Sequence, residues 1–141
     1  MDDPFDLQRF VDAQDAAATH ERALGELRRG RKSSHWMWFV LPQIAGLGHS
    51  GMDRTYSIRS LDEARAYLAH PVLGARLREA AGVVAEAPAS SADDLMGGVD
   101  AVKLRSSMTL FGRADPSEPV FRAVLDRWFD GDEDDLTLAR L

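Results

Sequence analysis

The sequence predicts a mainly α-helical protein, a compact single domain of residues 1–141 with six or seven short helices. Apolar residues recur at helical spacing along most of the chain, and brief loops of glycine or small polar residues separate these stretches. Hydrophobic residues make up 45% and charged residues 28% of the 141 positions, a globular composition with enough length to bury a core. The chain has no cysteine, which excludes disulfides, thiolate metal ligands and cysteine nucleophiles.

The first two helices are predicted from their end signals. Asp3 followed by Pro4 is typical of a helix N-terminus, and the next apolar residues share one helix face. We therefore expect a helix over residues 4–15. Thr19 is a candidate cap for the second helix, and Gly30 is a natural stop for it.

Residues 34–41 fit two local structures. In a strand, Trp36 and Trp38 lie on the same face, whereas in a short helix capped by Ser34 they point about 200° apart. A short apolar run has too few residues for its periodicity to decide. We favour the helix because the rest of the chain offers no good partner strand, and a minor strand pair through residues 36–41 is the alternative.

The remaining elements follow from glycine content, caps and apolar spacing. Glycines and small polar residues between Ile44 and Ile58 predict a loop. Ser60 and Glu63 then form a capping-box pattern that opens the next helix. Further helices are expected over residues 71–84, 91–95 (a brief turn capped by Ser91), 99–111 (with Gly112 as its stop) and 121–128, and residues 134–141 add a helical turn or a short extended piece.

The charge of the chain bears on its partners. The formal net charge is −6, which argues against a long nucleic acid because affinity for the phosphate backbone comes from lysine and arginine. The charge is uneven, with a basic cluster at residues 28–32 and an acidic one at residues 130–135. A small anionic ligand is compatible with this distribution.

Neither a membrane span nor a secretion signal is expected. The N-terminus is acidic and polar, without the apolar core of a signal peptide. The longest apolar run, residues 36–41, is far shorter than the about 20 residues that a bilayer-spanning helix needs. We therefore expect a bacterial cytoplasmic protein.

The segment 31–43 concentrates residue types that bind ligands or transfer protons. His35 is a candidate general base because imidazole changes charge near neutral pH, although a half-buried structural histidine has the same pattern. Trp36 and Trp38 are suited to stacking on a base or nicotinamide ring, but core burial is the commoner fate and we expect at least one of them in the core. The other candidates are Lys32 for a phosphate, Ser34, and Gln43, whose amide suits a base or sugar edge or caps a turn.

A second concentration of polar residues lies at positions 100–109. On a helix, Asp100, Lys103 and Ser107 share one face. This combination predicts an anion or ribose-phosphate site, with Ser106 beside it and Lys103 as a candidate catalytic residue. An i, i+3 ion pair between Asp100 and Lys103, with serines that allow close helix packing, explains the pattern equally well.

No metal or cofactor site is expected. His20, His49 and His70 lack the close spacing of metal ligands. The glycines at residues 46–48 match neither the Walker nor the Rossmann pattern. Residues 130–135 miss the calcium-loop pattern and are typical of a solvated surface.

Several motifs together resemble one protein family. They are Lys32-Ser33-Ser34-His35-Trp36-Met37-Trp38-Phe39, Pro42-Gln43, Gly46-Leu47-Gly48, residues 64–77 with Tyr67-Leu68-Ala69-His70-Pro71 and Leu73-Gly74, and Lys103-Leu104-Arg105-Ser106-Ser107-Met108-Thr109-Leu110-Phe111. They resemble the uncharacterised bacterial domain-of-unknown-function family 1810, over nearly the whole chain. The resemblance implies a small, mainly helical, stand-alone domain and no established activity. The automatic label calpastatin often given to that family finds no support, because that inhibitor type is disordered and this composition is globular.

Two functions are compatible with these residues. In the first, the two segments form a pocket for an anionic, nucleotide-like small molecule, for example an ADP-ribose derivative. A lysine would neutralise phosphate, a tryptophan would stack on a ring and His35 would transfer a proton. In the second, the aromatic segment is core and the protein is a non-enzymatic interaction module. A concave site that joins His35 to Lys103 would favour the first. The sequence leaves open whether the protein is an enzyme and what its oligomeric state is.

Overall fold

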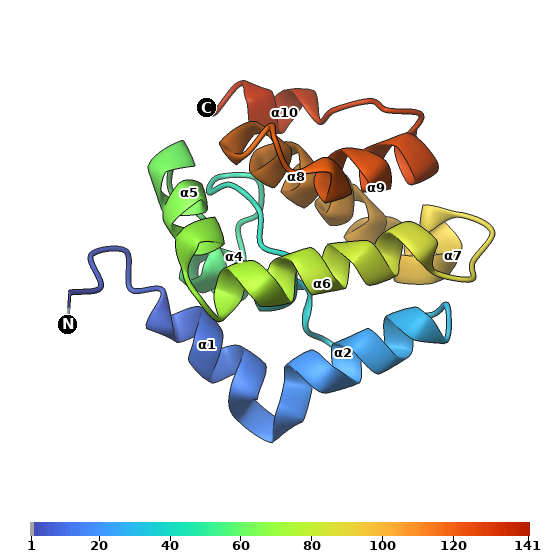
Figure 1. Cartoon of the computed structure of the whole chain (residues 1–141), viewed down its shortest axis with the longest axis horizontal. Helices are drawn as coiled ribbons and strands as arrows, with labels where there is room; N and C mark the ends of the chain where they lie inside the picture. The colour runs from blue at the N-terminus through green and yellow to red at the C-terminus, as the bar shows by residue number, and fades with distance from the viewer. Residues whose placement is uncertain (1) are drawn as a thin grey trace.

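The computed structural model describes residues 2–141 and confirms a mainly helical fold (Figure 1). Its helices are α1 (Gln8–Asp15), the 3-10 turn η1 (Ala16–Ala18), α2 (Thr19–Arg28), α3 (Met37–Val40), α4 (Gly51–Tyr56), α5 (Leu61–Ala69), α6 (Leu73–Glu86), α7 (Ala92–Met96), α8 (Gly98–Ala114), α9 (Pro119–Phe129) and α10 (Asp135–Leu138). The helices beyond the expected six or seven are short ones, in which periodicity gives little signal.

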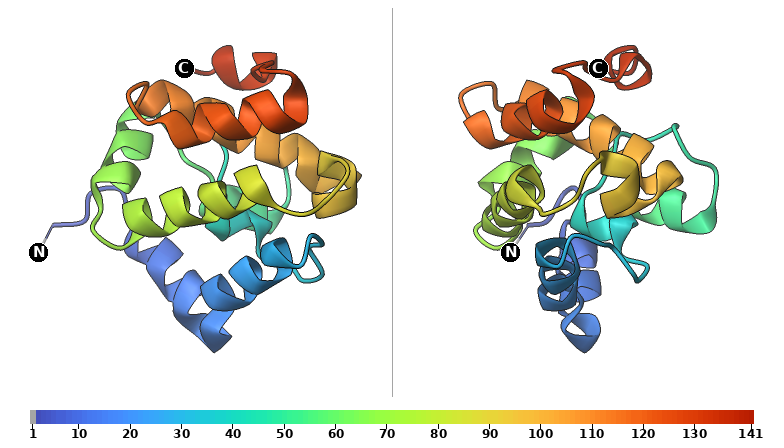
Figure 2. Two further views of the ribbon diagram at one scale, coloured as in Figure 1. Left: turned by 45° about the vertical axis from the view of Figure 1, so that its right-hand side comes forward. Right: turned by 90° about the vertical axis from the view of Figure 1, so that its right-hand side faces the viewer.

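Two long helices organise the molecule. α6 contacts α2, α5 and α9, and α8, with 17 residues, contacts α5, α7, α9 and α10. Figure 2 shows α1 and α2 as a V at one end and α10 at the opposite end. A row of fully buried aromatic rings runs from α1 through α5 and α8 to α9. The ring centroids lie 5.1 Å apart for Phe10 and Tyr67, 5.3 Å for Tyr67 and Phe111, and 6.0 Å for Phe111 and Phe121.

Asp3 binds the start of α1, but it is not the N-cap residue, which is Leu7, and the helix begins later than expected. The Asp3 carboxylate accepts hydrogen bonds from the backbone N–H groups of Leu7 (2.8 Å) and Gln8 (2.9 Å). α1 therefore starts at Gln8 and not at position 4. Asp6 has a left-handed backbone conformation with a φ of 52°, which interrupts any helix that begins at the proline. The second helix begins close to its expected start, but Thr19 is its first residue and not its cap: Ala18 is the N-cap residue, and the Thr19 hydroxyl donates to the Ala16 carbonyl (2.5 Å).

The helical interpretation of the aromatic segment is confirmed, since residues 37–40 form α3, but Ser34 does not cap it: the N-cap residue is Trp36, and the Ser34 hydroxyl donates to Glu26. The β pairing lies downstream of it. The Ala45 N–H donates to the Ile58 carbonyl (2.7 Å) and the Ile58 N–H donates to the Gln43 carbonyl (2.9 Å), which makes an isolated parallel bridge between Ile44 and Ile58. In residues 2–141 this bridge is the sole β pairing.

The expected loop between the two bridge residues contains a helix, so that prediction is wrong in part. Ser50 caps α4: its hydroxyl accepts a hydrogen bond from the Asp53 N–H (3.1 Å), and the Asp53 carboxylate accepts from the Ser50 N–H (3.3 Å). A helix of six residues without a buried apolar stripe has no periodic signal, which is why sequence reasoning missed it. The bridge and this capping box hold α4 next to α3.

Other helix ends were predicted with mixed success. Ser60 and Ser91 cap α5 and α7 as expected, each accepting a hydrogen bond from the backbone N–H three residues later. Gly112 does not end α8, which continues to Ala114. Gly112 lies against Phe121 of α9, and this packing offsets the low helix propensity of glycine.

Gly74→Ala is expected to lower the free energy of unfolding by about 2 kcal/mol, because it overpacks the junction of α5 and α6. A Cβ atom at Gly74 would lie 2.1 Å from the backbone carbonyl oxygen of Leu68, so the helices would have to move apart. Urea denaturation measures the change. Gly82→Ala is the control on the same helix, because the nearest atom to its Cβ would be Val120 Cγ2 at 4.0 Å. Equal stability of the two variants would contradict the prediction.

Candidate functional site

The segment that precedes α3 is organised around Glu26 of α2. One carboxylate oxygen, Oε1, accepts hydrogen bonds from the backbone N–H groups of Ser33 (2.8 Å) and Ser34 (3.0 Å) and from the indole N–H of Trp36 (2.8 Å). The other oxygen, Oε2, accepts from the Ser34 hydroxyl. The Glu26 side chain is buried, and these four donors surround it with the polar contacts that a buried anion needs.

These contacts change the acidity of Glu26. Burial on its own raises the pKa of the carboxyl group, but the hydrogen bonds from the Ser34 hydroxyl, the Ser33 N–H, the Trp36 indole and the Ser34 N–H outweigh it. The pKa of Glu26 is lowered to about 2. Ser34 and Trp36, both predicted ligand-binding residues, thus bind a carboxylate of the protein itself. Trp36 is also fully buried, so it is the core tryptophan that we expected.

Lys32 ties the same segment to α8. Its ammonium group lies 2.8 Å from Asp100 Oδ2, donates to the Ser34 carbonyl at 2.6 Å and lies 5.0 Å from the centroid of the Trp36 ring. The Lys32 side chain is 8% exposed. An ammonium group that is buried and paired in this way has its charge compensated inside the protein, which leaves it little capacity for the external phosphate that the sequence predicted.

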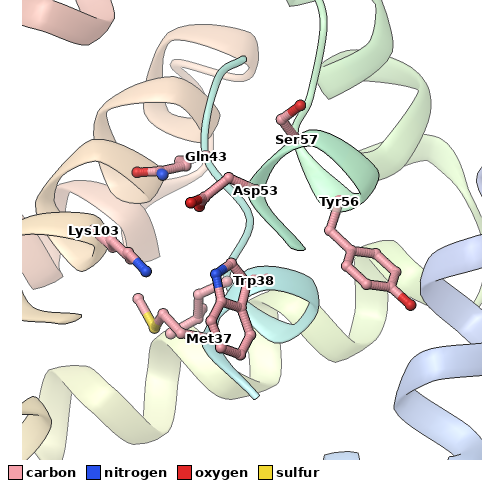
Figure 3. A pocket seen from close by; sticks show the side chains of 8 residues that line it. Met37, Trp38, Gln43, Asp53, Tyr56, Ser57 and Lys103 are labelled. Atoms are coloured by element: carbon pink, nitrogen blue, oxygen red, sulfur yellow. The ribbon is translucent and has the colours of Figure 1, made fainter. Parts of the chain in front are cut away.

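A narrow cavity lies between α3, α4 and α8. It is lined by Met37, Trp38, Leu41, Gln43, Asp53, Tyr56, Ser57 and Lys103. In Figure 3, Trp38, Asp53 and Lys103 point toward one another from these three helices, whereas the Tyr56 hydroxyl points away. The space available to water is about 10 Å³, enough for one water-sized group.

Two polar atoms of residues that line this cavity are buried and unpaired. Trp38 Nε1 and Asp53 Oδ1 have no hydrogen-bond partner among residues 2–141. The second carboxylate oxygen of Asp53 does have one, because Oδ2 accepts from the Ser50 hydroxyl at 2.7 Å. Buried polar atoms are paired in the great majority of proteins, and each exception needs an explanation. A ligand group that bonds to both atoms is one such explanation.

Lys103 supplies the positive charge of the cavity. Its ammonium nitrogen lies 5.1 Å from the centroid of the Trp38 ring and 3.8 Å from Asp100 Oδ1. Asp100 is much closer to Lys32, at 2.8 Å. The positive charge of Lys103 is therefore less fully compensated than that of Lys32, and the Lys103 side chain is 20% exposed. The predicted i, i+3 pair of Asp100 and Lys103 exists, and Asp100 bridges both lysines.

Gly48 makes room for the Asp53 carboxylate. A Cβ atom at Gly48 would lie 2.3 Å from Asp53 Cγ and 2.6 Å from Oδ1, far inside van der Waals contact. Glycine thus lets the backbone of residues 46–49 approach the carboxylate closely. Within the Gly46-Leu47-Gly48 motif only Gly48 serves this approach, because Gly46 has a φ of 95° and lies against Arg140.

The structure brings together only some of the predicted site residues. Trp38, Gln43 and Lys103 line one cavity, whereas His35 is exposed and does not line it. We expected His35 and Lys103 to line one cavity. In the part of the chain that the structure describes, only Lys103 lines this one. The two serines also lie elsewhere: the Ser106 hydroxyl donates to Asp134 Oδ2 (2.8 Å), and Ser107 is fully buried without a hydroxyl partner among residues 2–141.

Sequence reasoning missed Asp53. The available signal was the Ser50-x-x-Asp53 pattern, which is a helix N-terminus signature and says nothing about a ligand. For the chain from residue 2 onward, the structure contains no group of three or more histidine, aspartate or glutamate side chains that could hold a metal ion. None of its helices in that range combines the length and the apolar character needed to cross a membrane.

Comparisons with known proteins bear on the family. The model of the family described as protein of unknown function (DUF1810) matches residues 4–141. The crystal structure of the conserved hypothetical protein Rv1873 from Mycobacterium tuberculosis is similar, with a TM-score of 0.94 and 48% sequence identity. The match covers 99% of this chain and 98% of that one. No curated protein matches the chain.

Proposed function

The chain belongs to the DUF1810 family, and we propose that it binds a small anionic, nucleotide-like molecule at the cavity between Trp38 and Lys103. The observation that carries the proposal is the position of the Lys103 ammonium group. It lies at a cavity that also contains two buried, unpaired polar atoms, on Trp38 and Asp53. The same group is only loosely compensated by Asp100 at 3.8 Å.

The size of the cavity limits how such a ligand would bind. About 10 Å³ accommodates one water-sized group, so only one polar group of the ligand enters the cavity. The anionic group stays near the partly exposed Lys103, where the ammonium group stabilises it. The Gln43 amide lines the same cavity and supplies both a donor and an acceptor to the ligand.

The proposal is for binding and not for a particular reaction. His35 was the candidate general base, but it is exposed and does not line the cavity. A general base must come within hydrogen-bond reach of the proton that it removes, directly or through one water. We therefore leave His35 and a proton-transfer step out of the proposed function.

Thermal shift measurements with ADP-ribose, AMP and inorganic phosphate test the proposal. A ligand that binds only the folded state raises the melting temperature, by about 5 °C or more when its concentration is about 100-fold above Kd. Lys103→Gln is expected to weaken the binding of AMP or ADP-ribose about 10- to 100-fold, because a charged hydrogen bond is lost. Isothermal titration calorimetry measures that loss.

Arg65→Gln is the matched control for Lys103→Gln. Arg65 is a half-exposed cation on α5 that does not line the cavity, so its replacement should leave ligand affinity unchanged. Equal affinity of the Lys103 variant and the wild type would remove the lysine from the site. If no member of the panel changes the melting temperature, the proposal fails. The non-enzymatic interaction module then remains, with the exposed Val99 and Val102 of α8 as its candidate surface.

A further inference from the structure

The two unpaired polar atoms of the cavity have complementary chemistry. Trp38 Nε1 can only donate a hydrogen bond, and a carboxylate oxygen such as Asp53 Oδ1 accepts one. Both atoms are buried and neither finds a partner in the described part of the chain. Leaving such atoms unpaired costs free energy, so a group that pairs both of them at once is bound favourably.

A hydroxyl group of a ligand meets both requirements. It accepts from the indole N–H through its oxygen and donates its proton to the carboxylate. A fully ionised phosphate has no proton to donate, and an ammonium group has no lone pair to accept with. A hydroxyl is also about the size of the water-sized space in the cavity that both side chains line. The cavity therefore suits a hydroxyl group better than it suits an anionic group.

We propose that Asp53 and Trp38 together select a sugar hydroxyl of the ligand, while Lys103 contacts its anionic group. This inference rests on the proposed function, since it names the chemical feature that the same site recognises. Asp53 is the specificity-determining residue, because only a ligand with a donor hydroxyl pairs its free oxygen. A ligand without the hydroxyl leaves the buried carboxylate oxygen unpaired and binds more weakly.

Two neighbours of Asp53 hold the carboxylate ready for this contact. The Ser50 hydroxyl and N–H both bond to Oδ2, at 2.7 and 3.3 Å, which leaves Oδ1 for the ligand. Gly48 lies directly against the carboxylate, where a Cβ atom would come within 2.3 Å of Cγ. Gly48 and Ser50 are therefore positioning residues. Gly48→Ala is expected to displace the carboxylate and to abolish the preference for the hydroxyl.

The experiment compares AMP with its 2′,3′-dideoxy analogue by isothermal titration calorimetry. The two ligands have the same base and phosphate and differ only in the ribose hydroxyls. We expect AMP to bind about 10- to 100-fold more tightly to the wild-type protein, the factor for a hydrogen bond to a charged group. Equal affinity of the two ligands would overturn the inference and leave the proposed function standing. Failure of both ligands to bind would overturn the inference, and the proposed function would fail with it only if ADP-ribose and inorganic phosphate also leave the melting temperature unchanged.

Two variants assign the preference to the named residues. Asp53→Asn keeps the size of the side chain, and Trp38→Phe keeps an aromatic ring near Lys103 while removing the N–H. Each variant is expected to reduce the preference for AMP to less than about 3-fold, because it removes the hydrogen bond that produces this preference. Asp126→Asn, an exposed carboxylate on α9, is the control and should keep the full preference.

The Asp53 variant must be shown to be folded before its ligand preference is interpreted. The Asp53→Asn substitution disturbs the cap of α4, so circular dichroism and the melting temperature first establish that this variant is folded. If it is unfolded, Trp38→Phe decides, because that substitution leaves the bonds between Ser50 and Asp53 intact. A folded variant of either kind that still prefers AMP as strongly as the wild type does would overturn the assignment.

Discussion

Glu26→Gln is expected to lower the free energy of unfolding by about 3 kcal/mol at pH 7. The folded state holds the Glu26 pKa at about 2, some 2.5 units below its ordinary value of 4.5. Each unit corresponds to about 1.4 kcal/mol of preference for the charged form in the folded protein. Glutamine has one acceptor oxygen in place of two, and its NH₂ group would face the Ser34 hydroxyl or the Trp36 indole N–H.

Urea denaturation of the two proteins measures this difference. Glu21→Gln serves as the control, because Glu21 lies on the same helix in an exposed position in its first turn. The control is expected to change stability by less than about 1 kcal/mol, the size of a charge effect at a helix N-terminus. If Glu26→Gln were no more destabilising than Glu21→Gln, the four hydrogen bonds to Glu26 would not have the role that we assign to them.

The Glu26 contacts also explain why sequence reasoning misread the conspicuous segment. A tryptophan, two serines and a lysine within five residues are typical of an anion-binding site. The tryptophan and the serines do bind an anion, but it is the carboxylate of Glu26 from α2, and the lysine pairs with Asp100. The available signal was Glu26 itself, a charged residue between Ala23 and Leu27 on the apolar face of its helix. Charged residues are almost never fully buried unless they are paired.

The fold class was predictable because helical periodicity is a local property. α5, α6, α8 and α9 all lie where apolar spacing and caps place them, to within a few residues. α4 could not be predicted in the same way. It has no buried residues, and the bridge between Ile44 and Ile58 that brackets it joins residues far apart in the sequence.

The cavity was predictable only in part for the same reason. Trp38, Gln43 and Lys103 stood out by residue type, and the structure places them around one space. Asp53 belongs to that space through the packing of α4 on α3, a tertiary contact with no local pattern. His35 was selected for its chemistry, but the direction of a side chain next to a four-residue helix is not fixed by the sequence pattern. Asp53 was missed and His35 was misplaced for the same reason: tertiary packing, and not a local sequence pattern, determines whether each side chain reaches the cavity.

Acid is expected to weaken the wild-type protein through Glu26. A carboxyl group whose pKa is lowered on folding contributes its full stability above the ordinary value of 4.5 and loses it as the pH falls toward 2. For Glu26 this loss amounts to about 2 kcal/mol by pH 3. The Glu26→Gln variant has no such group, so the stability gap between the two proteins should narrow from about 3 to about 1 kcal/mol between pH 7 and pH 3.

Comparison of the two proteins isolates Glu26 from other acidic groups. The pKa of Asp3 is lowered by hydrogen bonds from backbone N–H groups, that of Gln8 first, and the pKa of Glu133 is lowered by Arg113. These groups titrate in both proteins, so their contributions cancel in the difference. Urea denaturation at several pH values from 7 to 3 therefore reports on Glu26 alone. A gap that stays constant over this range would show that the pKa of Glu26 is not lowered. The stabilising contacts would then act by packing and not by holding a charge.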